Sequence, residues 1–130
     1  MEILVDFPGG QRVDAHYRGL DVRSNQDGSD PSPFELFLVS LATCAGFYVM
    51  SFCQQRGLPT EGIQVVERMV RNPITRHLDQ IDIEIQVPET FPAQYRDALI
   101  KSANTCAVKK AIENPPKFNT YTKVVASHPS

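Results

Sequence analysis

The chain has 130 residues and a formal net charge of −2 at pH 7, from 13 basic and 15 acidic side chains. That length fits one domain, residues 1–130, with enough side chains for a core. The near-neutral charge and scattered basic residues argue against a nucleic-acid partner. Three cysteines are too few, and odd in number, for a disulfide scaffold.

The N-terminal part predicts three short strands. They cover residues 2–7, 12–18 and 20–24, and Pro8-Gly9-Gly10 marks a hairpin turn between the first two. The chain does not begin with a basic segment followed by an apolar one, so we predict no signal peptide and a cytoplasmic protein. In that compartment thiols stay reduced, and a transient redox pair is more plausible than a structural disulfide.

A long helix is predicted from Pro33 to Gly57. Ser32 fits the N-cap, and Pro33 fits the first helical position. Glu35 stands three residues after Ser32, the spacing of a capping box. Gly57 is a good C-terminal stop.

The middle of this helix carries no charge from Leu36 to Cys53. Its length touches the lower limit for a membrane span. Polar or small residues interrupt the stretch and no basic cluster flanks it, so we predict a buried central helix and no membrane partner. A helix that is apolar on most faces needs cover on most faces, and one chain of this size supplies little, so we expect a second subunit.

The C-terminal half predicts two strands, two helices and a last strand. The segment 78–87 alternates apolar and polar residues, as in an antiparallel sheet with one wet face. The fold class is therefore α+β. The predicted ranges are strands at 62–71 and 78–87, helices at 92–103 and 105–113, and a strand at 117–126.

Two cysteines carry the chemistry, because a thiolate attacks peroxides and disulfides. Cys106 is predicted to open a helix, where free N–H groups favour negative charge, with Lys109 and Lys110 on the same side. Cys44 lies mid-helix in apolar surroundings, so its pKa is expected to rise unless a cation is near. The candidate cations are Arg12, Arg18 and Arg23 on the N-terminal strands. Either cysteine taken alone also fits a small core residue.

Other reactive residues point to no further site. Cys53 is nine residues from Cys44, which places it on the opposite helix face, and we assign it to the core. His16, His77 and His128 lack metal-ligand spacing, so we predict no metal and no cofactor.

Two motifs resemble those of the OsmC/Ohr family, which comprises osmotically induced protein C and the organic hydroperoxide resistance proteins. The first is Ser32-Pro33-Phe34-Glu35-Leu36-Phe37-Leu38, followed by Leu41-Ala42-Thr43-Cys44. The second is Cys106-Ala107-Val108-Lys109-Lys110. The likeness covers most of the chain and is closest to the OsmC-like branch of the family.

The resemblance implies an OsmC-like fold: antiparallel sheets around a long buried central helix, in an intertwined homodimer with sites near the interface. It implies a thiol peroxidase that reduces small organic hydroperoxides and is reset by an external dithiol. By position, Cys44 is similar to the peroxidatic residue and Cys106 to the resolving one. An arginine and a glutamate assist in that family. Arg18, in Tyr17-Arg18-Gly19, is our first choice, and Glu35 stands one place after the family glutamate.

Three questions stay open at this point: the role of Glu35, the role of the apolar residues around Cys44, and the function of the protein. Glu35 fits the capping box as well as a catalytic role, and the spacing favours the cap. The apolar residues around Cys44 suit core, dimer contact or ligand pocket. Three functions are therefore compatible with the sequence. The first is a peroxidase, the second a non-catalytic protein that binds an apolar or thiol-reactive ligand at the interface, and the third a thiol sensor without turnover.

Overall fold

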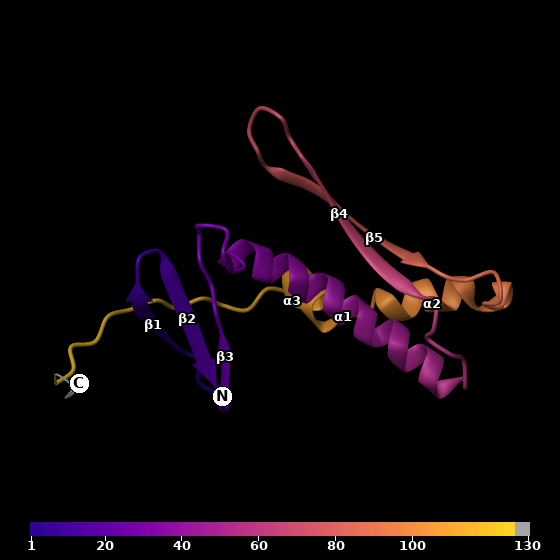
Figure 1. Cartoon of the computed structure of the whole chain (residues 1–130), viewed down its shortest axis with the longest axis horizontal. Helices are drawn as coiled ribbons and strands as arrows, with labels where there is room; N and C mark the ends of the chain where they lie inside the picture. The colour runs from indigo at the N-terminus through magenta and orange to yellow at the C-terminus, as the bar shows by residue number, and fades with distance from the viewer. Residues whose placement is uncertain (127–130) are drawn as a thin grey trace.

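The computed structural model describes residues 1–126; residues 127–130, which include His128, lie outside the described residues. The class is α+β, with antiparallel sheets and a long helix, as predicted (Figure 1). The elements are β1 (Leu4–Gly9), β2 (Arg12–Tyr17), β3 (Leu20–Val22), α1 (Pro33–Gln55), β4 (Gln64–Arg71), β5 (Leu78–Gln86), a 3-10 turn (Ala93–Tyr95), α2 (Arg96–Ala103) and α3 (Ala107–Glu113).

The first three strands form an antiparallel sheet with β2 in the middle. Arg18 and Gly19 connect β2 to β3, with φ of 47° and 75°. Positive φ at both central residues is the geometry of the tight hairpin turns that match strand twist. This sheet lies beyond the N-terminal end of α1 (Figure 1). The turn therefore presents Arg18 at the tip of the sheet.

Both ends of α1 follow the predicted local rules. The Glu35 N–H donates to Ser32 Oγ at 3.2 Å, and the Ser32 N–H donates to Glu35 Oε1 at 2.9 Å. The capping box is therefore confirmed. At the other end, the Leu58 N–H donates to the Cys53 carbonyl at 2.9 Å, and Gly57 has a φ of 64°. That is a Schellman stop, which ends the helix just short of Gly57.

Within the described chain, α1 is buried along one stripe. Val49 and Cys53 on this stripe join the core with Phe91 and Leu99. On the other side, Phe47 is 56% exposed. Of the described helices, α1 is the one long and apolar enough to cross a membrane, by length and composition alone. The buried residues of α1 are Leu38, Leu41, Ala45, Val49, Phe52 and Cys53.

The β4–β5 hairpin covers part of α1 and then projects past it (Figure 1). Val65 stands opposite Ile85 in the register, and both pack against the core. The predicted alternation of β5 is real, with Ile81, Ile83 and Ile85 on one face. The hairpin therefore turns a row of isoleucines toward the cysteine-bearing helices.

The C-terminal prediction needs correction. The helix expected at 92–103 is a 3-10 turn followed by α2, and the next helix begins at Ala107 rather than at residue 105. The strand expected at 117–126 is wrong, because these residues form no strand and are exposed. Strand-forming side chains such as Val124, 98% exposed, lie in a segment that pairs with none of the strands β1–β5 in the described part of the chain. This segment extends from α3 toward the end of the molecule that holds β1–β3 (Figure 1).

Candidate functional site

Two helices bring the predicted cysteines together. Cys44 lies in the middle of α1 and is half-buried, whereas Cys106 is the N-cap of α3 and is 2% exposed. The turn before Cys106 is held in place from both sides. Ser102 Oγ donates to the Tyr48 carbonyl of α1 at 3.3 Å, and Thr105 Oγ1 donates to the Ser102 carbonyl at 2.6 Å. The α2–α3 connection is therefore fixed one helical turn beyond Cys44.

Cys106 and the first residues of α3 face the sulfur of Cys44. Burial acts to raise the pKa of the Cys44 thiol, but the Cys106 thiol and the backbone N–H groups of Val108 and Ala107 bond to it and lower the pKa below its usual value. The expectation that Cys44 needs a nearby cation to avoid a raised pKa is therefore wrong. Sequence reasoning missed these donors because they are main-chain groups of a helix far along the chain.

The pKa of Cys106 moves the other way. Burial raises the pKa of the Cys106 thiol, and its contact with Cys44 raises it further, against the N–H groups of Lys109 and Val108. The expectation that the start of α3 would make Cys106 a thiolate is wrong, because the N-cap sulfur is buried. Cys44 is therefore the more acidic thiol of the pair, and Cys106 is the less acidic one.

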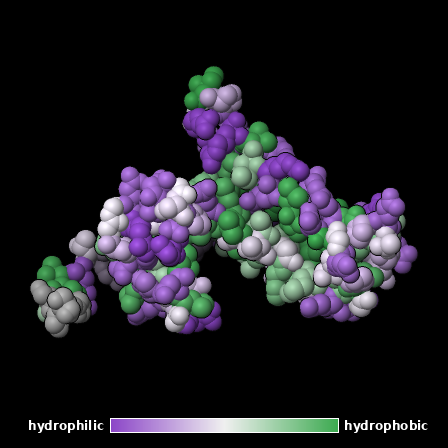
Figure 2. Space-filling model, viewed as in Figure 1, coloured by the Kyte–Doolittle hydropathy of each residue, from purple (hydrophilic) through white to green (hydrophobic). Residues whose placement is uncertain are grey.

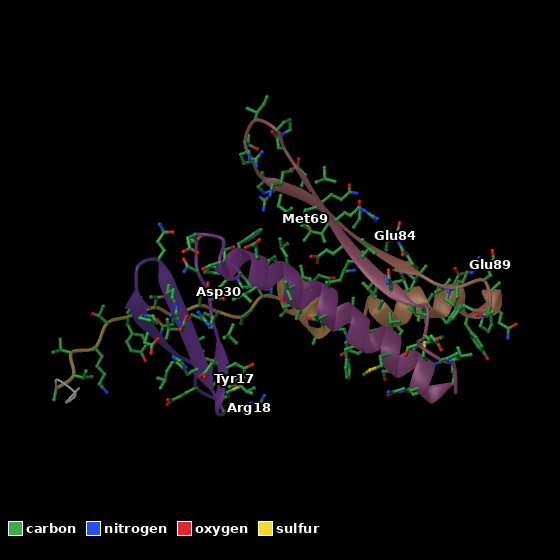
Figure 3. The ribbon with its side chains drawn as sticks, viewed as in Figure 1. Tyr17, Arg18, Asp30, Met69, Glu84 and Glu89 are labelled. Atoms are coloured by element: carbon green, nitrogen blue, oxygen red, sulfur yellow. The ribbon has the colours of Figure 1, made fainter. Side chains whose placement is uncertain are left out.

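The three candidate arginines lie elsewhere in the described chain. Arg12 is paired with Asp14, and Arg23 with Asp30 at 3.6 Å. Arg18 lies over the Tyr17 ring, 5.6 Å from its centroid. Figure 3 places Arg18 at the tip of the N-terminal sheet, away from α1 and α3. None of the three contributes to the pKa of Cys44 in its own chain.

Glu35 is committed to the helix cap. The pKa of its carboxyl is lowered by the backbone N–H of Ser32 and by the Ser32 side chain. The same carboxylate has no part in the pKa of Cys44. Within one chain, the structural role of Glu35 is therefore the one that geometry supports.

A cavity of about 500 Å³ lies beside the cysteine pair. Its floor is α1, one wall is β5, and the other wall is α2 with α3. Hydrophobic residues (green) gather over the middle of the visible face, around α1 and the base of the hairpin (Figure 2). The alternating sequence of β5 predicted an apolar face, but it did not predict that this face borders a cavity. The lining residues are Leu41, Ala45, Ile81, Ile83, Ile85, Ile100, Ala103, Asn104, Cys106, Lys109 and Ile112.

The third cysteine stands apart from this site. Cys53 is fully buried in the core, and burial raises the pKa of its thiol. Its assignment to the core is confirmed. Among residues 1–126, no three histidine, cysteine or acidic side chains gather as metal ligands would.

The family follows from the sequence match. The model of the OsmC family, described as OsmC-like protein, matches residues 26–121. The chain therefore belongs to the OsmC-like proteins, and both cysteines lie inside the matched segment. The comparison with curated proteins found no match.

Solved structures agree on the fold. A protein of Psychrobacter arcticus 273-4, assigned provisionally to osmotic stress and detoxification responses, has a TM-score of 0.70 at 19% identity over 84% of this chain and 85% of that one. The OsmC-like protein of Mycoplasma pneumoniae has a TM-score of 0.70 at 11% identity over 88% and 87%. An OsmC-like protein of unknown function from Vibrio cholerae has a TM-score of 0.61 at 10% identity over 86% and 92%.

Proposed function

We propose that this OsmC-like protein is a thiol peroxidase of small organic hydroperoxides, with Cys44 as the attacking residue and Cys106 as the resolving one. The observation that carries the proposal is the contact of the two thiols with opposite pKa shifts. A lowered pKa supplies the thiolate that attack requires. A neighbouring thiol that has kept its proton supplies the partner for the next step.

The reaction balances in three steps. The Cys44 thiolate attacks the distal oxygen of ROOH, the O–O bond breaks, and the alkoxide leaves and takes a proton from water to give ROH. Cys44 becomes a sulfenic acid, which condenses with the Cys106 thiol to form the Cys44–Cys106 disulfide and release water. An external dithiol then reduces this disulfide, becomes a disulfide itself, and restores both thiols.

The assembly in the proposal is a homodimer, in which a second copy covers the exposed side of α1. Support comes from the apolar side chains on that side, Val39, Phe47 and Met50, which are 51%, 56% and 38% exposed. Unpartnered apolar surface on a helix of this kind marks an interface. The proposal keeps the protein in the cytoplasm, where a dithiol reductant is available.

The test is consumption of cumene hydroperoxide in the presence of dithiothreitol. The Cys44→Ser variant should lose turnover, because the attacking sulfur is gone. The matched control is Cys53→Ala, which removes the buried core thiol and should keep turnover. Wild-type turnover in Cys44→Ser would sink the peroxidase assignment.

A second candidate is a non-catalytic protein that binds an apolar or thiol-reactive ligand. The apolar cavity beside Cys106 favours it, as does the lack of any arginine or lysine side chain acting on Cys44 within the described chain. Clefts of this size and lining are typical of small-molecule sites. A protein that binds cumene hydroperoxide without consuming it would fit this candidate.

A further inference from the structure

The β4–β5 hairpin carries one carboxyl group on its apolar face. In the strand register Glu67 of β4 stands opposite Ile83 of β5, and opposite residues of an antiparallel pair share a face. The next pair on this face toward the base, Val65 and Ile85, packs against the core. Toward the tip the next residue is Met69, which is exposed (Figure 3). Glu67 therefore lies where the packed base of the hairpin passes into the half that projects past α1.

The carboxyl group of Glu67 is held there without a partner. The side chain is half-buried, and its buried Oε2 accepts no hydrogen bond in the part of the chain that the structure describes. Burial raises the pKa of the Glu67 carboxyl. A buried polar group without a partner costs free energy, and a charged one costs more. The packed hairpin therefore accommodates the protonated carboxyl better than the carboxylate.

The helix and the strand that meet this face bring no compensating charge. On β5 the residues that share the face are isoleucines. On α1 the stretch Leu36–Cys53 holds no charged side chain. The titratable groups of that stretch are the thiols of Cys44 and Cys53 and the phenol of Tyr48. All three are neutral or become negative, so none of them would stabilise an ionised Glu67.

The basic residues nearby are engaged elsewhere. Arg71 of β4 lies over the Phe34 ring at the start of α1, 5.2 Å from its centroid. Lys109 lines the cavity from α3, and its Nζ donates to Asn104 Oδ1 at 3.2 Å. Neither cation affects the pKa of Glu67, which burial alone raises.

We propose that Glu67 is a proton switch for the β4–β5 hairpin. With the carboxyl protonated, the hairpin stays packed on α1; with the carboxyl ionised, its isoleucine face lifts from α1 and opens the cavity wall opposite Cys106. Lifting returns the carboxylate to water, which removes the cost of burying its charge. The link to turnover rests on the proposed function, because the switch then sets access to the thiol pair.

The direction of the pH effect follows from the raised pKa of Glu67. The packed hairpin binds this proton more tightly than an unfolded chain does. Its packing is therefore most stable below the unfolded pKa of about 4.3. It weakens as the pH rises through the folded pKa of Glu67.

The test is amide hydrogen exchange over a pH series, with the protection of β4 and β5 expressed relative to that of α2. In wild type this relative protection should fall at least about fivefold as Glu67 ionises, the size expected for one buried polar group without a partner. Glu67→Gln and Glu67→Met remove the titration, so both variants should keep the hairpin protected. The His77–Asp79 pair on the hairpin titrates in all of them, so the difference between variants isolates Glu67.

The matched control is Glu84→Gln. Glu84 lies on the polar face of the same hairpin, pointing away from α1, and pairs with Arg68 at 3.3 Å (Figure 3). This variant should keep the wild-type fall in protection. A carbon-detected NMR titration of the wild type should give Glu67 a higher pKa than Glu84, whose pKa is lowered by Gln86 first and then by Arg68.

Level relative protection across the pH series in wild type would overturn the inference, and so would an equal fall in wild type and Glu67→Met. A Glu67 that titrates below Glu84 would also overturn it, because a cation, for instance from a second copy of the chain, would then meet the carboxylate. Should neither Glu67 variant fold, the wild-type titration and protection still decide. None of these measurements uses a peroxide, so their outcomes are independent of whether the peroxidase proposal holds.

Discussion

The thiol of Cys106 lies in contact with the sulfur of Cys44; this contact acts to lower the pKa of Cys44, whereas burial first and then the same contact raise the pKa of Cys106. A donor stabilises the thiolate form of its acceptor, whereas the donor itself is held in its protonated form. The N–H groups of Val108 and Ala107 add to the effect on the Cys44 side. The start of α3 thus lowers the pKa of Cys44, an effect that was expected from an arginine side chain.

The first prediction concerns this donor. Cys106→Ala removes it, so the pKa of Cys44 should rise and alkylation of Cys44 by iodoacetamide should shift to higher pH. Cys106→Ser keeps an O–H donor at the same place, so the pKa of Cys44 should change less. The measurement is the pH dependence of the alkylation rate, in a Cys53→Ala background. Identical profiles for the alanine and serine variants would contradict the proposed role of the donor.

The second prediction separates the two roles of Glu35. Glutamine also serves in a capping box, so Glu35→Gln should keep both the thermal stability and the turnover of wild type. Ser32→Ala removes the reciprocal cap and should cost about 1 kcal/mol of unfolding free energy, measured in urea. A Glu35→Gln variant that is stable but inactive would show that the carboxylate takes part in catalysis.

The reason the cap could be predicted from sequence is that it is local. Ser32 and Glu35 are three residues apart, and their spacing alone defines the hydrogen bonds. The strand predicted at 117–126 depends on pairing with a sheet edge, and the segment pairs with none of β1–β5, so propensity could not decide it. Antiparallel β5 could be predicted in part. Its alternating residues define an apolar and a polar face, but they do not say which elements each face packs against.

In the candidate site, too, local sequence features could be predicted, whereas features that depend on tertiary contacts could not. The residue types at Cys44 and Cys106 were sufficient to select the pair, with the help of the family motifs. Their relative acidity was predicted wrongly, because it depends on where the backbone N–H groups of α3 point and on how deeply Cys106 is buried. Lys109 was assigned to Cys106 by its helical spacing, whereas in the fold its side chain lines the cavity and bonds Asn104.

The third prediction concerns pH. His16 on β2 bonds Asp21 of β3 at 2.7 Å and Asp6 of β1 at 3.1 Å, and these contacts, Asp21 first, raise its pKa. The folded protein therefore binds this proton more tightly than the unfolded chain. The resulting stability is fully present below the unfolded pKa of about 6.5, and it is lost as the pH rises through the folded pKa.

An NMR titration should give a His16 pKa above that of an unfolded peptide. Asp21→Asn should lower the pKa of His16 more than Asp6→Asn does, since Asp21 contributes the larger hydrogen-bond effect. His16→Gln should remove the part of the melting-temperature change that follows this titration. A larger effect from Asp6→Asn would contradict the assignment.

The fourth prediction tests the homodimer. Phe47→Asp places a charge on the exposed apolar side of α1, so it should raise the dimer dissociation constant at least about tenfold, as expected for an aromatic anchor. The control is Ile74→Asp at the tip of the β4–β5 hairpin, where the side chain is 89% exposed and should contact no subunit. Sedimentation velocity at micromolar concentration measures both. A wild-type monomer under these conditions would refute the dimer.

The fifth prediction concerns Arg18. Its side chain lies over Tyr17 at the tip of the N-terminal sheet, away from the Cys44 of its own chain (Figure 3). If Arg18 assists catalysis, it must therefore do so at the site of the other subunit. Arg18→Ala should then slow hydroperoxide attack more than about tenfold, because loss of a close ion pair shifts a thiol pKa by roughly one to three units. Single-turnover oxidation of Cys44 measures the rate.

Mixed dimers identify which subunit supplies the residue. Arg18→Ala chains are slow and Cys44→Ser chains are inactive, but a dimer of one of each holds one site with both a native Cys44 and a native Arg18 when the arginine acts across the interface. Co-expression of the two variants should therefore give more activity than either variant alone. Arg23→Ala is the control, since Arg23 is paired with Asp30. Full activity of the Arg18→Ala homodimer would leave Cys44 activated by the start of α3 and by Cys106 alone.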